Sequence, residues 1–577
     1  MTHSLQSATA DIGGLIRLPG GDLLRAILNM DRPEGFVRSL PPDDFFRIVK
    51  RIGKEDALPV LAAASGEQWQ YLLDLETWRR DSLDASKTLV WLECLARANA
   101  ARLAEWLFSE QGDLVSLILL RRAHVLFRDE EGQWDVPSGY VSLDGAFYIK
   151  AADPVEAQLL ENFLRVLARG NDEAYWALLF NLSSYLPAET EEELYRLRSA
   201  RLAEYGFPPF EEALAVYAPL EPSALKVEAK PLLPGALALD EEKDLIPVAS
   251  FFNIEDFGFL KETLGRLTDP PETDRIRLEF ATLCNTLIAA GSYACLDDDE
   301  GLGHIGRQAA GYLHLALTAL CGQDTDHAAK VLSHHSLMTI FRVGYGYAAK
   351  LQWRAKRWVA ESWFSKAGRR LDFWGSPWSD VLEGLLLTRP LCFDPDAPGT
   401  YRPFESYDDV RKTEERLVQA QALDRMLARL THIASGPAAI ESATFAPLLF
   451  ARWARHLLCL EPSFTPLSRA QAAAFFRLLR QGETGPPYRM ERHQSAFIWE
   501  FCKGAAGFEA AAADALSRAL SDLWTMFARE YENVATKDLS CRYAKYLPIR
   551  PGRSEEDIHA GAHTRPDQPP EKTKQVV

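Results

Sequence analysis

Carboxylates recur at a spacing of twelve residues between Leu40 and Leu75, and oxygen ligands of this kind could hold a divalent cation. Aligned in register, the pattern places acidic side chains at the same positions of three successive units: Asp43, Asp44, Glu55, Asp56 and Glu67. The first four are the candidate metal ligands, for magnesium or calcium. The same carboxylates would also complement the positive ends of three short helices, and this second interpretation stays open.

A second candidate site lies in the run from Phe341 to Trp378, which is rich in tryptophan and arginine. If the run is helical, its basic residues form a ridge opposite an apolar face. An arginine stacked on tryptophan could bind a carboxylate or a phosphate through two parallel hydrogen bonds from its planar guanidinium group. The alternative is a solvated face over a tryptophan-rich core. The candidate binding residues are Lys350, Arg354, Arg357, Trp358, Arg370 and Trp374.

Two further motifs favour a structural role over a ligand-binding one. Gly301-Leu-Gly-His-Ile-Gly306 has the spacing of a dinucleotide loop, but four acidic residues precede it and would repel a phosphate. The motif therefore predicts a turn that opens a helix. Histidines at 304, 314, 327, 334 and 335, with Cys321, do not have the spacing of a zinc site. We predict no catalytic residue and no cofactor.

Composition narrows the class of partner. The chain has 577 residues, 47% of them apolar, and a net charge of −17, which disfavours nucleic acid and anionic membrane surfaces. Its eight cysteines are scattered without a CxxC pair, as in a reduced cytoplasmic protein. No apolar window approaches the roughly 20 residues of a membrane span. We expect a protein of the cytoplasm.

The elements that position the first candidate site are three short helices. Twelve residues do not return to the same face at about 3.6 residues per turn, so the helix must break between units. The predicted breaks lie at Pro41-Pro42, Gly53 and Ser65-Gly66, and Ser65 with Gln68 fits a capping box. Each unit must bury its apolar pair against its neighbours, as in a small solenoid.

The remaining pattern predicts a mainly α fold in two parts. A helical repeat domain covers 1–217, with a small antiparallel β-hairpin insertion at 123–150 signalled by Asp144-Gly145. A proline-rich linker follows at 218–250, then a helical domain at 251–547 and a disordered tail at 548–577. Helical runs are predicted at 272–291, 304–321, 326–370, 408–435, 440–460, 467–481 and 491–533.

Two resemblances add to this reading. Residues 40–75 resemble the short-helix repeats in the cytoplasmic N domain of bacterial magnesium channels, which implies a superhelical, cytoplasmic, regulatory module without the channel's membrane part. A longer resemblance joins the repeat to four sequence stretches and is to a family of large bacterial proteins catalogued as a domain of unknown function, which implies no activity. The stretches are Leu143-Asp-Gly-x-Phe-Tyr-Ile, Tyr205-Gly-Phe-Pro-x-Phe-Glu-Glu-Ala, Phe341-Arg-Val-Gly-Tyr and Gly375-Ser-Pro-Trp.

The leading hypothesis is therefore a helical scaffold or regulatory module that binds another protein and has no catalytic activity. The alternative is a sensor or enzyme for a small anion or a divalent cation. It would use the region 350–378 or the acidic residues of the repeat.

Overall fold

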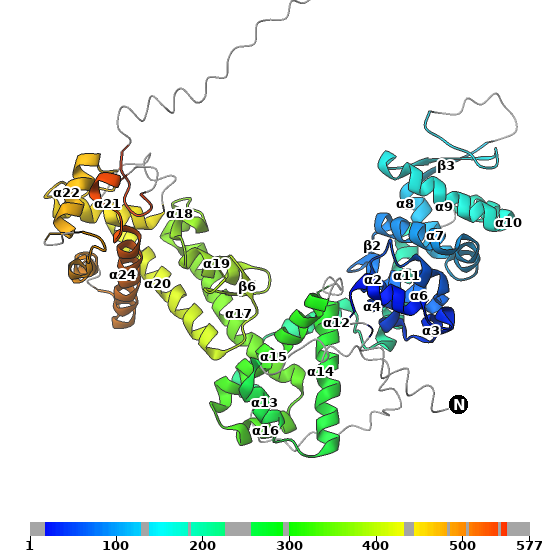
Figure 1. Cartoon of the computed structure of the whole chain (residues 1–577), viewed down its shortest axis with the longest axis horizontal. Helices are drawn as coiled ribbons and strands as arrows, with labels where there is room; N and C mark the ends of the chain where they lie inside the picture. The colour runs from blue at the N-terminus through cyan, green and yellow to red at the C-terminus, as the bar shows by residue number, and fades with distance from the viewer. Residues whose placement is uncertain are drawn as a thin grey trace, which may run out of the picture. The chain divides into compact units, whose positions relative to one another are not determined.

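The structure is a computed structural model, shown in Figure 1. It describes residue 15 and residues 18–128, 138–182, 186–225, 256–291, 299–397, 399–431, 444–481, 485–503, 507–539 and 544–550. The fold is mainly α, as predicted, and the sheets among the described residues are two-stranded. The chain forms two compact units, Met1–Gly344 and Tyr345–Val577.

The first unit begins with the helical repeat and its flanking helices. Its elements up to residue 225 are α2 Gly20–Leu28, α3 Pro33–Ser39, α4 Pro42–Ile52, α5 Leu58–Ala63, α6 Gly66–Glu76, β1 Trp78–Arg79, β2 Ser82–Leu83, α7 Ala85–Glu110, α8 Gly112–Arg122, β3 Ala123–Phe127, β4 Phe147–Ala151, η1 Pro154–Glu156, α9 Ala157–Gly170, α10 Asp172–Asn181, α11 Pro187–Glu204, α12 Phe210–Ala213, η3 Leu214–Tyr217 and η4 Pro222–Leu225. After residue 255 it continues with α13 Gly258–Leu264, α14 Pro270–Ala290, α15 Asp299–Cys321, α16 Thr325–His334 and the start of α17 Leu337–Glu361.

The three repeat helices α4, α5 and α6 break where the sequence predicts. Gly53 ends α4 with φ 94°, a left-handed conformation that glycine adopts without a steric cost. Ser65 and Gln68 form the predicted capping box: the Ser65 hydroxyl accepts from the Gln68 N–H, and the Gln68 side chain accepts from the Ser65 N–H. The repeated apolar pairs are all buried, as the solenoid interpretation requires: Ile48, Val49, Val60, Leu61, Leu72 and Leu73.

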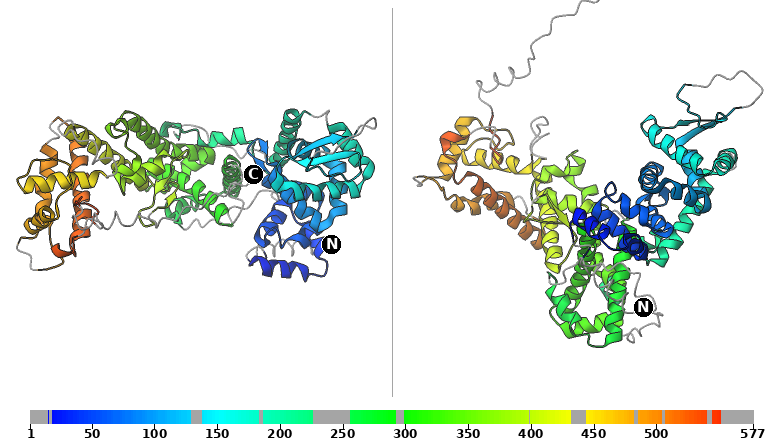
Figure 2. Two further views of the ribbon diagram at one scale, coloured as in Figure 1. Left: turned by 90° about the horizontal axis from the view of Figure 1, so that it is seen from above. Right: turned by 45° about the vertical axis from the view of Figure 1, so that its right-hand side comes forward.

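The predicted hairpin insertion is present. Strands β3 and β4 pair antiparallel with Ala123 opposite Ala151 and Phe127 opposite Phe147. The Asp144-Gly145 turn joins β4 to an isolated bridge at Val141 rather than to β3. The Asp144 carboxylate holds this turn by accepting from the N–H groups of Ala146 and Phe147, both at 2.9 Å. The hairpin contacts α8 through β3 and α9 through β4, and is drawn in cyan in both views of Figure 2.

The predicted linker lies mostly outside the described residues and stays a prediction. Its first eight residues, 218–225, are packed within the first unit. The Arg342 guanidinium donates to the Ala218 carbonyl at 2.7 Å, the Leu220 N–H donates to the Arg342 carbonyl at 3.2 Å, and Leu225 is buried. The first unit therefore continues beyond this segment to Gly344.

The second unit contains the rest of α17 and the elements α18 Trp363–Lys366, η8 Leu371–Trp374, α19 Trp378–Leu386, β5 Cys392–Phe393, β6 Tyr401–Arg402, α20 Tyr407–Thr431, α21 Phe445–Leu457, α22 Arg469–Leu479, η9 Glu491–His493, α23 Gln494–Cys502, α24 Ala510–Tyr531 and η11 Thr536–Asp538. The prediction of one helical run over 326–370 is wrong, because the chain is extended at His335 and again at Ser362. Residues 548–550 of the predicted tail pair with Leu467, and the remainder of the tail lies outside the described residues.

The core of the second unit is aromatic. Phe450 stacks on Phe527 with ring centroids 4.1 Å apart and on Phe497 at 4.9 Å, and Trp524 packs beside them. Across both units, no described helix combines the length and the apolar character that a membrane crossing would need.

Candidate functional site

Three acidic residues of the repeat, Asp43, Asp44 and Glu55, pair with arginines. Arg47 lies 3.6 Å from the Asp43 carboxylate and 3.7 Å from that of Asp44. Asp43 is only 6% exposed, and its burial, with the nearby Asp44, raises its pKa to about 6 against the opposing effect of Arg47. Asp43 and Asp44 belong to the first turn of α4, where carboxylates complement the helix dipole.

The other candidate metal ligands lie at the surface. Glu55 pairs with Arg97 at 2.6 Å, and Asp56 is exposed. Among the described residues, no three histidine, cysteine or acidic side chains come together in a group that could hold a metal ion. The structure therefore does not unite Asp43, Asp44, Glu55 and Asp56 into one site.

The tryptophans of the predicted anion site lie in or against the core. Trp374 is fully buried among Phe364, Phe373 and Phe445, and Trp358 lies 6.0 Å from it between ring centroids. Trp358 also hydrogen-bonds the Asp424 carboxylate, which accepts two backbone N–H groups at the start of α18. These two tryptophans therefore build structure rather than an open binding face.

The basic residues of the same prediction are spread along the surface. Arg354 forms an ion pair with Glu414 of α20, and Lys350 is half-buried. Arg357 and Arg370 are exposed, and neither has a side-chain partner among the described residues. The structure thus brings together the aromatic half of the predicted site and leaves the basic half outside it.

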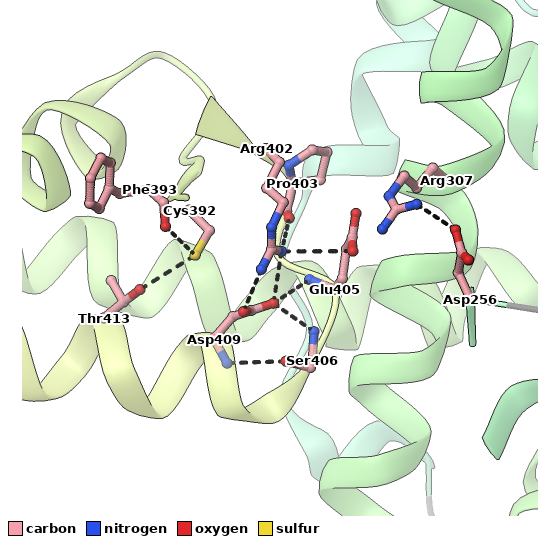
Figure 3. A network of polar contacts seen from close by, with 10 residues as sticks. All are labelled: Asp256, Arg307, Cys392, Phe393, Arg402, Pro403, Glu405, Ser406, Asp409 and Thr413. Atoms are coloured by element: carbon pink, nitrogen blue, oxygen red, sulfur yellow. Dashed lines mark hydrogen bonds and ion pairs between the residues drawn. The ribbon is translucent and has the colours of Figure 1, made fainter. Parts of the chain in front are cut away.

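Figure 3 shows the densest polar network of the β5–β6 hairpin, and it also has a structural explanation. Arg402 grips Asp409 with two bonds of 2.8 and 3.0 Å, while Asp409 accepts the N–H groups of Glu405 and Ser406. Burial would raise the pKa of Asp409, but the Arg402 guanidinium and these donors outweigh it and lower the pKa. The neighbouring Cys392 thiol has its pKa raised to about 11 by burial and by Asp409, so it stays protonated and is a poor nucleophile.

The remaining unusual motifs are likewise structural. Gly301 to Gly306 lies within α15, which begins at Asp299, so the motif lies in the first turns of the helix rather than in a turn before it. Arg307, which follows the motif, pairs with Asp256 at 2.6 Å (Figure 3). His314 contacts the rings of Phe257 and Phe259.

One surface feature of the first unit is an open groove of about 650 Å³ beside β3, lined mainly by apolar side chains. It is formed by the hairpin, the end of α8 and the end of α10, and is lined by Leu120, Ala123, His124, Val125, Leu126, Phe127, Tyr140, Phe147, Leu179, Phe180 and Leu182. Phe180 is 69% exposed, Phe127 53% and the adjacent Trp176 39%. Large aromatic side chains gathered at one exposed place mark a binding surface.

The aromatic residues of the groove form a continuous row. The Phe147 ring lies 5.2 Å from that of Phe127 and 5.0 Å from that of Trp176. On α10, Tyr175 and Leu179 face inward and are buried, while Trp176 and Phe180 face outward. A helix that is apolar on two adjacent faces needs either burial or a partner for both, and these two faces of α10 are the signal in the sequence that indicates the groove.

The outer edge of β3 borders this groove. In an antiparallel pair, successive residues direct their backbone groups alternately toward the partner strand and away from it. Arg128 N–H donates to the Ala146 carbonyl at 2.9 Å and Ala152 N–H to the Arg122 carbonyl at 2.9 Å, so even-numbered residues of β3 bond β4. The N–H and C=O groups of Val125 and Phe127 point away, and they have no partner among the described residues.

A nearby arginine cluster provides a contrast in charge. Around the start of α7, Arg79 pairs with Asp84, Arg121 with Glu191 and Arg122 with Glu156, beside a cleft of about 480 Å³. These cations are already neutralised by carboxylates of the same chain. The exposed cations of the hairpin, Arg128 and Lys150, form no ion pair with a described residue.

The second unit has its own exposed aromatic site. Trp499 on α23 is 66% exposed beside an open groove of about 710 Å³, which Ile498, Cys502, Ala513 and Ser517 help to line. The Lys503 ammonium group lies 4.8 Å from the Trp499 ring centre and also pairs with Glu500. This groove offers one large aromatic side chain where the groove of the first unit offers a row.

The comparisons with known proteins add a family and no activity. No curated protein and no solved structure matches the chain. The family described as "Family of unknown function (DUF6178)" matches residues 3–550, which is nearly the whole sequence, and the chain belongs to that family.

Proposed function

We propose that this protein is a helical module that binds another protein and performs no chemistry of its own. The observation that carries the proposal is the row Phe127, Phe147 and Trp176 with Phe180 beside it, of which three side chains are substantially exposed. Aromatic side chains are the commonest anchors of protein interfaces, because each buries a large apolar area at a small entropic cost.

The chemistry of the described side chains agrees with a binding role. Four cysteines have pKa values shifted upward, each mainly by burial: Cys94, Cys321, Cys392 and Cys502. Reactive thiols have lowered pKa values, so these four have no activated character. Free cysteines scattered over both units also support our placement of the protein in the cytoplasm.

The surface can be tested by placing a photo-crosslinking residue at Phe180 of the full chain in its native cell extract. We expect one protein to be joined at this position, and the product to disappear when Phe127→Ser is added, because that change removes a neighbouring anchor. A crosslinker at Leu28, which is 45% exposed on α2, is the matched control. The proposal fails if position 180 gives no product, or gives the same products as position 28.

A further inference from the structure

We propose that the groove takes an extended segment of the partner, which adds to the edge of β3 that faces away from β4, as a third strand of the β3–β4 sheet. This inference rests on the proposed protein-binding function and specifies its mode. The segment we expect is acidic on one face and apolar on the other. Three features of the hairpin support this mode: its hydrogen-bonding edge, its two different faces and its charge.

The edge offers donors and acceptors at the spacing of a strand. Val125 and Phe127 are two residues apart, so their outward N–H and C=O groups repeat at about 7 Å, the period at which a paired strand presents its own. An added strand would bond these groups without disturbing β4, which bonds the alternate residues. Exposed strand edges are templates for this kind of pairing.

The β3 edge differs from those of the other described sheets in its length. The strands of the β1–β2 and β5–β6 pairs have two residues each, whereas β3 and β4 have five. Among the described residues, this is therefore the sheet whose edge is long enough to hold a peptide in register. It is also the sheet whose edge borders the apolar groove.

The two faces of an added strand would meet different surroundings. Odd-numbered residues of the hairpin share one face, where Phe147 and Ile149 are buried and Phe147 contacts Trp176. Side chains of the partner on this face would lie against Phe127 and Phe180. These residues require apolar side chains at alternate positions of the segment.

The opposite face carries cations that form no ion pair with a described residue. Arg128, His124 and Lys150 are exposed on the even-numbered face, and Lys150 lies 5.8 Å from the Tyr140 ring centre. The Asp144 carboxylate of the turn accepts the backbone N–H groups of Ala146 and Phe147. In a chain of net charge −17, two cations that pair with no described carboxylate favour an acidic partner segment.

The test is to pan a random dodecapeptide library, displayed on phage, against the full-length protein. We expect enriched peptides that alternate apolar and acidic residues. Val125→Pro should weaken their binding at least tenfold, because proline removes an outward N–H that β4 does not use. Val125→Thr, which keeps the N–H, is the matched control and should bind within twofold of the native chain. Arg128→Glu should weaken the acidic peptides and leave the thermal melt unchanged.

A second measurement does not depend on the folding of any variant. Each backbone nitrogen of one enriched peptide is methylated in turn, and its affinity for the unaltered protein is measured. Strand addition requires that methylation weakens binding at every second position and is tolerated between them. Uniform tolerance, or losses at every third and fourth position as in a bound helix, would overturn the inference.

The outcomes separate this inference from the function on which it rests. Peptides that bind Val125→Pro as well as the native chain would overturn strand addition and leave protein binding in place. If no peptide is enriched, the inference also falls, while crosslinking at Phe180 judges the function independently with whole proteins. A dimer of the native chain in sedimentation, lost in Val125→Pro, would assign the edge to a second copy and overturn the partner segment.

Discussion

The Phe147 ring meets the Trp176 ring edge to face, with centroids 5.0 Å apart and planes inclined at 74°. This contact fixes the β3–β4 hairpin to α10, and so shapes the groove between them. Phe147 is buried at 2% exposure, whereas Phe180 on the same helix as Trp176 is 69% exposed. The two phenylalanines should therefore respond to mutation in opposite ways.

Phe147→Ala should destabilise the first unit by about 3–5 kcal/mol, because it leaves a cavity beneath the hairpin. Phe180→Ser should change stability by no more than about 0.5 kcal/mol and still abolish crosslinking to the partner from a photo-crosslinking residue placed at Phe127. Denaturant melts of the two variants make the comparison. Equal destabilisation by both would mean that Phe180 belongs to the core.

Asp43→Asn should stabilise the protein at neutral pH. Burial raises the pKa of Asp43 to about 6, above its ordinary value of 3.8. The folded state therefore favours the protonated form, and the stability that this gives below pH 3.8 is lost as the pH rises through about 6. The charged groups that face Asp43 are Asp44 and Arg47.

From the size of this shift, the variant should gain on the order of 2–3 kcal/mol over the native chain at pH 7.5, and the gain should shrink as the pH falls toward 4. Hydrogen exchange of α4 measured at several pH values gives the difference. Asp56→Asn, at an exposed carboxylate, is the control. A gain that does not depend on pH would show that the pKa of Asp43 is not raised.

Gln68→Ala should cost about 2–4 kcal/mol, more than a capping box alone is worth. The Gln68 amide donates to the carbonyls of Val37 and Leu40, both at 2.8 Å, and its oxygen accepts the Ser65 N–H. The second capping box, Ser468 with Gln471, supplies the control, since the Gln471 side chain accepts the Ser468 N–H as a capping box requires and bonds no carbonyl among the described residues. Gln471→Ala should cost about 1 kcal/mol or less, and equal costs would contradict the role of the two carbonyls.

A fragment that begins at residue 205 should be more stable than one that begins at residue 251. The segment 205–225 packs on α14, and Tyr217 contacts the Phe341 ring at 6.3 Å while Val216 and Leu225 are buried. Thermal melts of the two fragments, both ending at residue 577, test this. Equal cooperativity and melting temperature would favour a domain break within 218–250.

Small ligands should leave the melting temperature of the protein unchanged. Magnesium, calcium, zinc, nucleotides and phosphorylated metabolites form the panel, and a true ligand at 100 times its dissociation constant would stabilise the fold by about 2.7 kcal/mol. A ligand-induced shift in melting temperature that Glu55→Gln abolishes would support the predicted cation site. A ligand-induced shift in melting temperature that Arg357→Ala or Arg370→Ala abolishes would support the predicted anion site.

The sequence by itself determined the features that depend on local chemistry. Gly53, Ser65 and Gln68 set the ends of the repeat helices through backbone freedom and capping, which act over a few residues. The period of the apolar pairs predicted which side chains are buried. The change to alternating residues near Asp144 predicted the hairpin in the same way.

Tertiary structure decided which of the aromatic and charged residues remain available to contact a partner or a ligand. Arg354 meets Glu414 and Trp374 enters an aromatic core with Phe445, and these partners lie about sixty to seventy residues away in the chain. The groove also joins β3 to α10, which are distant in the chain, and the outward edge of β3 is defined by which residues β4 bonds. Burial and hydrogen-bond partners of this kind depend on packing between distant segments, which no local pattern of residues encodes.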